Sequence, residues 1–321
     1  MKLEHFLEKT NQDKDSLIIY ETEEEAIPAI RGNYRAIQYV KDKSYDFLLK
    51  AVKENYEVLK CIKNQTEELC IEAVKHDGRA LQYVLNQTDK ICLETVKKYG
   101  WALEYVKKQT PEINMAAVKS FGRSLEYIEN QTPELCLEAV KSMGLALEYV
   151  KEQTSEICLA AVKNTGYALQ YVKEQTPEIC LAAVKESEFV FNLVKKQTPE
   201  IVLAAVSREH FYGEIDFSNR DILIALAKNG HYHWGITRVS YISKIPEEYR
   251  DEELYLLAVS NNGDVLEDID VEKQTEKICI AAIKNKPTSI QYVINQTPEL
   301  CMYAVLLDKK AMEYVDLSIF E

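Results

Sequence analysis

The chain lacks the features that identify several large classes of protein. Its 321 residues contain no apolar run near 20 residues and no apolar N-terminal signal, so we expect a protein that neither enters a membrane nor is exported. They also contain no glycine-rich phosphate loop after a strand, no serine elbow and no recognisable Cys-His pair. The sequence therefore predicts no catalytic residues, no cofactor and no enzymatic activity.

Basic residues and histidine are scarce. The 39 Lys and Arg are outnumbered by 52 Asp and Glu, which gives a net charge of −13. Residues 1–30 carry −5 of this and residues 245–273 carry −8, so the rest of the chain is neutral. A neutral array does not favour direct binding of nucleic acid. His231 and His233 lack further ligands at a recognisable spacing, so we expect no metal site.

What the sequence does contain is a repeat. The dipeptide Gln-Thr returns every 22 residues, and a fixed period of this length is typical of a stacked repeat array. The dipeptides are Gln65-Thr66, Gln87-Thr88, Gln109-Thr110, Gln131-Thr132, Gln153-Thr154, Gln175-Thr176, Gln197-Thr198, Gln274-Thr275 and Gln296-Thr297.

One copy, Thr154 to Gln175, explains the pattern. Its threonine suits the N-cap of a helix, and the proline and acid that follow in several copies suit the first turn. The apolar run Ile157 to Val162 predicts a buried helix that ends near Lys163. We expect Gly166 to adopt the left-handed turn conformation, and a second, half-exposed helix to follow. Helices this short need stacked neighbours to be stable.

The sequence therefore predicts an all-α fold, an α-solenoid of about thirteen stacked helix-turn-helix repeats of 22 residues. We divide the chain into an N-terminal capping segment (1–21), regular repeats (22–218), irregular repeats with an insertion (219–274), and C-terminal repeats with a cap (275–321). The predicted repeat starts are Thr22, Ser44, Thr66, Thr88, Thr110, Thr132, Thr154, Thr176, Thr198, Asn219, Asp251, Thr275 and Thr297.

Seven of the eight cysteines share one position of the repeat. Packed helices lie about 8–10 Å apart, whereas a disulfide needs Cα atoms within about 7 Å. The pattern thus favours small buried thiols in a reducing compartment, and we expect the cytoplasm. The seven are Cys70, Cys92, Cys136, Cys158, Cys180, Cys279 and Cys301.

The pattern Thr-Pro-Glu-Ile-Cys-Leu-Ala-Ala-Val-Lys, followed by Gly, Ala-Leu, Tyr-Val and Gln, resembles a known repeat. It is similar to the short helical repeats of a family classed as a domain of unknown function (DUF4116-like), which form arrays in bacterial and large-virus proteins. The resemblance covers most of the chain. It implies an architecture and no activity.

The repeat loses its register between residues 207 and 250, where aromatic residues, histidine and arginine concentrate. Such residues anchor interfaces, and insertions in solenoids often form binding loops. We therefore expect a non-enzymatic scaffold that binds another protein through its concave or insertion surface. A decayed repeat that refills the core is an alternative, and so is an enzyme or metal protein built on the insertion. The candidate partner-binding residues here are Arg220, His231, His233, Trp234 and Arg238.

The acidic segment after the insertion suggests a different function. Here the protein would be an inhibitor, of a viral or mobile-element counter-defence type, that blocks the basic cleft of a nucleic-acid-processing enzyme. Its partner would then be a basic nucleic-acid-binding protein. The carboxylates that would make this contact are Glu247, Glu248, Asp251, Glu252 and Glu253.

Overall fold

The computed structural model describes residues 20, 22–207, 211, 213–229, 231–234 and 237–320, without the side chains of residues 231–239. Of the expected capping segment, residues 1–21, all but Tyr20 lies outside this part. The chain forms two compact units, Met1–Asn164 and Thr165–Glu321, and each is described by itself.

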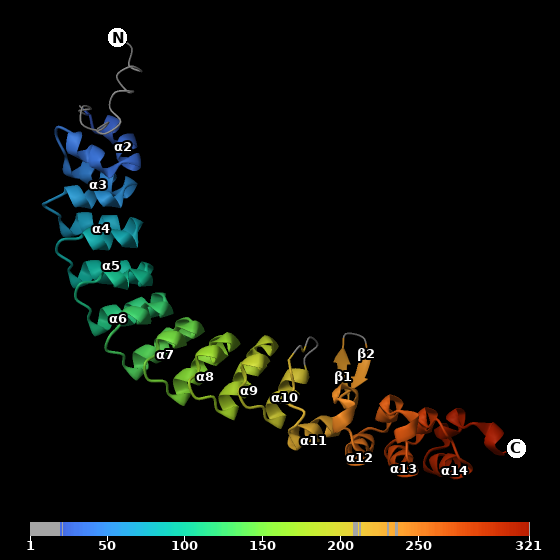
Figure 1. The fold of residues 1–321 in the computed structure, drawn as a ribbon. Helices are drawn as coiled ribbons and strands as arrows, with labels where there is room; N and C mark the ends of the chain where they lie inside the picture. Colours follow the sequence, from blue (N-terminus) through green and yellow to red (C-terminus); the bar gives the residue numbers. More distant parts are fainter. Residues whose placement is uncertain are drawn as a thin grey trace. The chain divides into compact units, whose positions relative to one another are not determined.

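The first unit alternates α-helices and 3₁₀-helices (Figure 1). Its α-helices are α2 (Glu23–Gly32), α3 (Tyr45–Glu54), α4 (Glu67–His76), α5 (Asp89–Lys98), α6 (Pro111–Ser120), α7 (Pro133–Ser142) and α8 (Ser155–Asn164). Its 3₁₀-helices are η1 (Tyr34–Tyr39), η2 (Tyr56–Cys61), η3 (Gly78–Tyr83), η4 (Gly100–Tyr105), η5 (Gly122–Tyr127) and η6 (Gly144–Tyr149).

The second unit follows the same plan and includes the irregular part. Its α-helices are α9 (Pro177–Glu186), α10 (Pro199–Val206), α11 (Arg220–Lys228), α12 (Glu252–Asn261), α13 (Glu276–Asn285) and α14 (Pro298–Leu307). Its 3₁₀-helices are η7 (Gly166–Tyr171), η8 (Glu188–Leu193), η9 (Ile242–Lys244), η10 (Glu247–Tyr249), η11 (Gly263–Asp268), η12 (Val271–Lys273), η13 (Pro287–Tyr292), η14 (Lys309–Tyr314) and η15 (Leu317–Phe320). Two strands, β1 (His231–Trp234) and β2 (Thr237–Ser240), form an antiparallel hairpin.

The described residues contain thirteen α-helices, and each begins directly after one of the predicted repeat starts. The capping threonine works as expected, because Thr132 Oγ1 accepts a hydrogen bond of 3.2 Å from the backbone N–H of Leu135. Asn219 and Asp251 cap α11 and α12 in the same way. The predicted α-solenoid is therefore confirmed, and the hairpin is a local exception to its all-helical pattern.

The second segment of each regular repeat is a 3₁₀-helix, and the expectation of a second α-helix was wrong in this detail. In η3 the buried Gly78 and Leu81 are three residues apart, and Val84, which is also buried, caps the helix. A 3₁₀-helix has three residues per turn, so it aligns these positions on one face. A segment of six residues is too short for its sequence pattern to distinguish a period of three residues per turn from the 3.6 of an α-helix.

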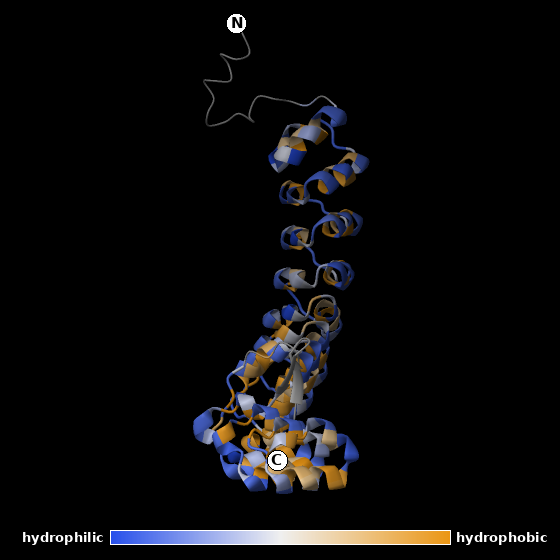
Figure 2. Ribbon diagram, turned by 90° about the vertical axis from the view of Figure 1, so that its right-hand side faces the viewer, coloured by the Kyte–Doolittle hydropathy of each residue, from blue (hydrophilic) through white to orange (hydrophobic). Residues whose placement is uncertain are grey.

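The α-helices of neighbouring repeats contact one another, and the 3₁₀-helices form a second row of contacts. Figure 2 shows the two rows side by side in the first unit, each combining hydrophilic and hydrophobic residues. The core lies between the rows. In one repeat it is built from the buried side chains of Leu135, Cys136 and Val140 on α7 and Leu147 on η6.

Glycine begins several 3₁₀-helices, but Gly78, Gly100, Gly122 and Gly166 do not adopt the expected left-handed conformation. Its role is to allow close approach. A Cβ atom at Gly100 would lie 2.5 Å from the carbonyl oxygen of Ala117 in the next repeat, and one at Gly122 would overlap the carbonyl oxygen of Ala139. Any side chain here would separate neighbouring repeats.

The glutamine of the Gln-Thr dipeptide joins consecutive repeats. The Nε2 group of Gln87 donates to the carbonyl oxygens of Leu81 and Tyr105, both at 2.9 Å. Its Oε1 atom accepts from the backbone N–H of Lys107, also at 2.9 Å. One side chain thus ties the 3₁₀-helices on either side of it together. We call this arrangement the glutamine clamp; Gln65, Gln131 and Gln296 form it with equivalent partners.

Two other residues occupy the position of the clamp glutamine. Arg250 precedes the cap of α12, and its guanidinium donates to the carbonyl oxygens of Ile245 (2.6 Å) and Ser243 (3.1 Å). Lys43 precedes the cap of α3 and donates to the carbonyl oxygen of Val40 at 2.7 Å. Both side chains thus bond to backbone carbonyls of the repeat that precedes the junction, although not to the carbonyls that the glutamine reaches.

The eight cysteines are free thiols, and seven of them are buried. Burial raises the pKa of Cys70 to about 11, and it also raises the pKa of Cys92 and Cys279. These thiols are therefore protonated and unreactive near neutral pH. Within the described residues, no helix is both long and apolar enough to cross a membrane.

Candidate recognition surface

The insertion predicted as a partner surface is a hairpin that takes the place of a second helix. His231, His233 and Trp234 lie in β1, and Arg238 lies in β2 opposite His233. Their side chains lie outside the part that the structure describes. Whether these four residues contact a partner stays a prediction.

Arg220 is engaged within the chain. Its guanidinium lies 2.8 Å from a carboxylate oxygen of Asp251 and 2.6 Å from one of Glu253. Hydrogen bonds to Asp251 and then to Glu253 raise the pKa of Arg220. Burial alone would raise the pKa of Asp251, but the hydrogen bond from Arg220 and those from backbone N–H groups outweigh it and lower the pKa. Three of the predicted partner-binding residues thus form one internal ion-pair network.

The other predicted carboxylates differ in their surroundings. Glu252 accepts a hydrogen bond of 3.3 Å from Thr275 Oγ1 and so joins α12 to α13. Glu247 and Glu248 lie in η10 and are exposed. Asp251 also caps α12, through a 2.9 Å bond from the backbone N–H of Leu254. The acidic segment is therefore partly structural.

A second surface lies on the 3₁₀ row of the first unit, and the sequence predictions missed it. The second residue of each 3₁₀-helix in this row changes from repeat to repeat. By contrast, the third residue is always small or valine, the fourth is always leucine or isoleucine, and both are buried. These second residues are exposed or half-buried. We call them the recognition column: Arg35, Glu57, Arg79, Trp101, Arg123 and Leu145.

The arginines of the recognition column are held in place by their neighbours. Arg79 binds Asp77 at 2.6 Å, and its guanidinium lies 5.5 Å from the centre of the Tyr56 ring. Arg123 lies 3.3 Å from Glu126 and 5.4 Å from the centre of the Tyr149 ring. Both guanidiniums keep donor groups free for a ligand, because each has five N–H donors.

Aromatic rings line the same row. Trp101 is half-buried, with Tyr99 at 5.8 Å and Tyr105 at 6.3 Å between ring centres. Partial burial raises the pKa of Tyr105, Tyr127 and Tyr149, so their phenols remain protonated donors at neutral pH. Rings and arginines in contact are typical of residues that anchor protein interfaces.

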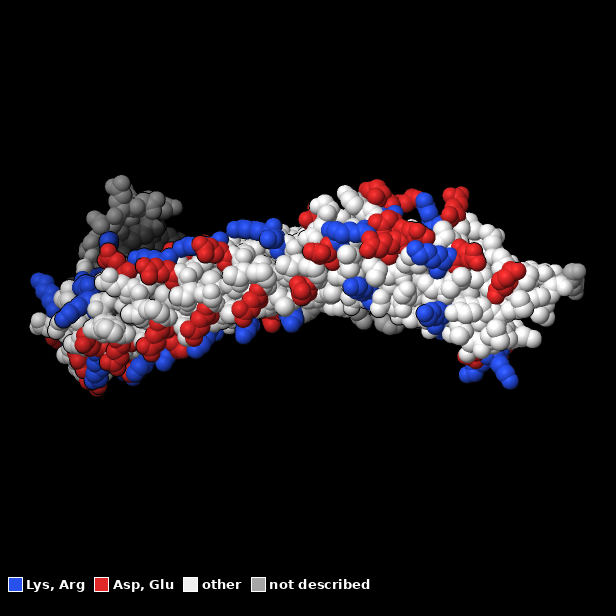
Figure 3. Space-filling view, turned by 90° about the horizontal axis from the view of Figure 1, so that it is seen from below, with Lys and Arg blue, Asp and Glu red and all other residues white. Residues whose placement is uncertain are grey.

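In the second unit the same repeat position carries Tyr167 on η7 and Phe189 on η8. Tyr167 is 48% exposed and Phe189 is 63% exposed, which is high for aromatic side chains on a regular framework. Figure 3 shows acidic and basic side chains close to one another on one face of the molecule. At this repeat position the second unit is therefore distinguished by exposed aromatic residues and not by charge of one sign.

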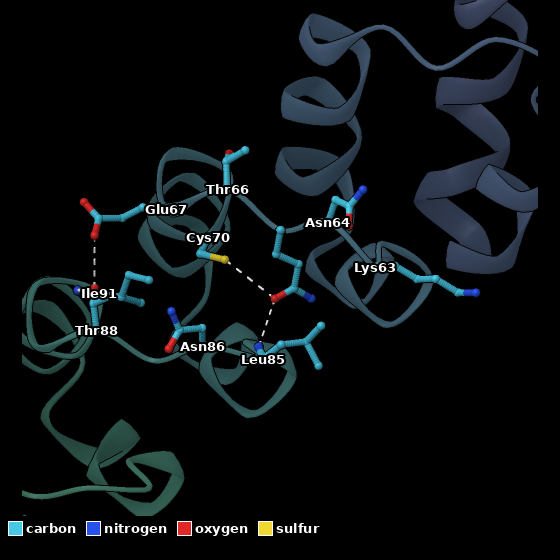
Figure 4. Close-up of a pocket in the computed structure, with 10 residues that line it drawn as sticks. Lys63, Asn64, Thr66, Glu67, Cys70, Leu85, Asn86, Thr88 and Ile91 are labelled. Atoms are coloured by element: carbon cyan, nitrogen blue, oxygen red, sulfur yellow. Dashed lines mark hydrogen bonds between the residues drawn. The ribbon is translucent and has the colours of Figure 1, made fainter.

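A groove of about 430 Å³ lies at the junction of two repeats in the first unit (Figure 4). Gln65 is one of the residues that line it, and its Oε1 atom accepts hydrogen bonds from Cys70 and from the backbone N–H of Leu85. Glu67 is held by Thr88 and, at 2.6 Å, by Lys90, whose hydrogen bond lowers the pKa of the glutamate. The groove thus consists of clamp and cap residues whose polar groups already serve the junction.

The fold and this surface define an array of helical repeats, in which the buried positions are nearly constant and one exposed position varies. The sequence model of a family described as a domain of unknown function (DUF4116) matches residues 66–106, 88–131 and 132–176. The match, which lies within residues 66–176, agrees with the resemblance that the sequence pattern indicated. No curated protein and no solved structure matches the chain.

Proposed function

We propose that the protein is a non-enzymatic scaffold that binds a segment of a partner protein along the recognition column of its first unit. The observation that carries this proposal is the contrast within each 3₁₀-helix. The second residue varies and is accessible, while the residues after it are buried and nearly constant. In a repeat array, such a position is free to determine which partner binds.

The residue types in the column support binding of protein. Tryptophan, tyrosine and arginine are the side chains that most often dominate binding free energy in protein interfaces. Arg79 and Arg123 are already ordered by an acid and a tyrosine ring, so less conformational entropy is lost when a partner binds.

The spacing of the column indicates the form of the partner. Packed helices lie about 8–10 Å apart, and an extended chain advances about 3.3 Å per residue. An extended peptide along the row would therefore meet one column residue for about every three of its own. We propose an extended segment, because a compact partner would meet fewer successive repeats.

The hairpin and the acidic segment have less support as the main surface. Arg220 already pairs with Asp251 and Glu253, and its single positive charge offsets one of their two negative charges, which reduces the charge available to a basic enzyme. An inhibitory role against a nucleic-acid-processing enzyme therefore stays the second candidate. The protonated, free thiols fit a reducing compartment, and we propose the cytoplasm.

Affinity capture from the native cell, followed by quantitative mass spectrometry, tests the proposal. We expect the triple variant Arg79→Ala, Trp101→Ala and Arg123→Ala to lose a protein that the wild type retains. The matched control is Lys97→Ala, Lys119→Ala and Lys141→Ala, which also changes one exposed residue in each of three repeats, but on the α-helical row. Equal capture by the wild type and both variants would contradict the proposal.

A further inference from the structure

The last repeat presents an apolar groove of about 490 Å³. It lies among α14, η14 and η15, and Figure 2, in which the C-terminus is labelled, shows hydrophobic stretches in this region. Leu306 is 84% exposed, Leu317 is 63% exposed and Met312 is 58% exposed. We call this surface the end face; its main residues are Met302, Val305, Leu306, Met312, Leu317 and Phe320.

The end face departs from the repeat pattern. Leu306 and Leu307 stand where the preceding repeat has Lys284 and Asn285, and the seven repeats that start at Ser44 to Thr176 also have a lysine followed by a polar residue. Lys284 and Asn285 are exposed although α14 packs against α13. A further repeat stacked in the same way would therefore leave Leu306 in water. The leucines are adapted to another contact.

Contiguous exposed apolar surface of this kind usually marks a site of association. The opposite end of the described chain is a poor match, since the first turn of α2 carries Glu23, Glu24 and Glu25. A second copy of the end face is a suitable partner, because the groove is apolar throughout. Lys310 and Glu313 of η14 are exposed beside it, so its rim carries both signs and two copies would not repel each other there.

We propose that the end face binds the end face of a second copy of this chain, about a two-fold axis. The same patch then serves both partners, as in most symmetric dimers. In this contact the exposed Leu306, Met312 and Leu317 side chains of each copy would be covered by those of the other. This association is independent of partner binding on the recognition column.

Light scattering and sedimentation of the full chain over a wide range of concentration test the proposal. We expect a monomer–dimer equilibrium in the wild type. The double variant Leu306→Lys and Leu307→Asn reproduces the pair that ends α13, and it should weaken the dimer about tenfold or more, mainly through Leu306. Circular dichroism should confirm that the variant is folded. Leu145→Lys, at an exposed leucine of the first unit, is the matched control and should leave the mass unchanged.

Hydrogen exchange of the wild type gives a second measurement that needs no substitution. Amides in residues 298–320 should become protected as concentration rises, and those of η3 to η6 should not change. A monomer at all concentrations, a dimer that persists in the double variant, or protection confined to other residues would overturn the proposal. Capture of a partner by the double variant should equal that of the wild type, so a failure here is distinct from a failure of the proposed function.

Discussion

The regular repeats and the irregular segment, residues 207–250, use different elements to join one repeat to the next. In a regular repeat, Gln131 bonds to Tyr149 and Lys151, at the end of η6. In the irregular segment, Gln197 bonds to the backbone of Glu214 (2.8 Å) and Asp216 (2.9 Å), which belong to no helix. The glutamine clamp is therefore retained where the second helix is lost.

The same holds one repeat later. There a hairpin replaces the second helix, and Arg250 takes the position of the clamp glutamine. The first helix and its cap persist in both places, since Asn219 and Asp251 still accept hydrogen bonds from the first turn. The comparison teaches that caps and clamps maintain the array, while the second element can be replaced. Diversity on the surface is expected on that second element.

The largest effect is expected where the regular repeats approach most closely. Gly122→Ala should lower the free energy of unfolding by about 3 kcal/mol, because the new methyl group would overlap a helix carbonyl. Gly213→Ala in the irregular segment should cost less, since the atoms nearest to the new group are ring atoms of Phe191 and Phe211, and side chains can move more easily than a helix carbonyl. Thermal and urea unfolding would measure both.

The control for these substitutions is Gly32→Ala. A Cβ atom there has no neighbour within 4 Å, and alanine favours a helix more than glycine does. It should therefore leave stability unchanged or raise it slightly. Equal losses at Gly122 and Gly32 would show that close approach is not the reason for the glycine.

The clamps of the two regions can be compared directly. Gln131→Ala removes three hydrogen bonds to backbone groups and Arg250→Ala removes two. We expect each to cost about 2 kcal/mol in unfolding experiments. Gln82→Ala is the control, because this exposed side chain bonds only within its own 3₁₀-helix and should change little. A negligible loss for Arg250→Ala would mean that the irregular segment is held by other contacts.

Trp234→Ala together with Arg238→Ala tests whether the hairpin is a binding surface. If it is, binding of the captured partner should weaken by about 2 kcal/mol while the melting temperature hardly changes. If the hairpin only refills the core, loss of the tryptophan should lower stability by about 3 kcal/mol and leave binding intact. If the partner binds on the recognition column, the double variant should either lose stability alone or change neither quantity. The experiment therefore decides whether the hairpin or the recognition column is the binding surface.

The smallest effect concerns a buried polar atom of the regular region. The hydroxyl of Ser124 is fully buried and makes no hydrogen bond, at a position where neighbouring repeats have alanine. Ser124→Ala should therefore raise the free energy of unfolding by about 1 kcal/mol. Ser142→Ala is its control, since that hydroxyl is exposed and bonds to Lys119 at 3.3 Å. A loss of stability at Ser124 would indicate an unrecognised partner.

The repeat starts could be predicted from the sequence because a cap is a local feature. Thr132 and the N–H that it accepts from are three residues apart, within one turn of helix. The clamp could not be predicted, because Gln131 finds its partners 18 and 20 residues later, and only the stacked structure brings them together. The role of Gly122 was mistaken for the same reason, since its contact lies in the next repeat.

The recognition column did leave a signal in the sequence. Aligning the repeats with one another shows that the residue after the glycine changes from arginine to tryptophan to leucine, at Arg79, Trp101 and Leu145. Exposure cannot be read from such an alignment, because a buried position also varies when its neighbours compensate. The hairpin left a weaker signal, a stretch without the 22-residue period, which predicts irregularity but no particular structure.

The glutamine clamp joins only neighbouring repeats, and this affects how the number of repeats can change during evolution. Gln109 bonds to Tyr127, 18 residues later, and nothing in that bond depends on how many units lie beyond. Loss of residues 110–131 would join Gln109 to Thr132 and bring Tyr149 to the same spacing. Gain or loss of one whole 22-residue unit can therefore change the copy number while the spacing of the clamp is kept. Each event would add or remove one residue of the recognition column and leave the others in register.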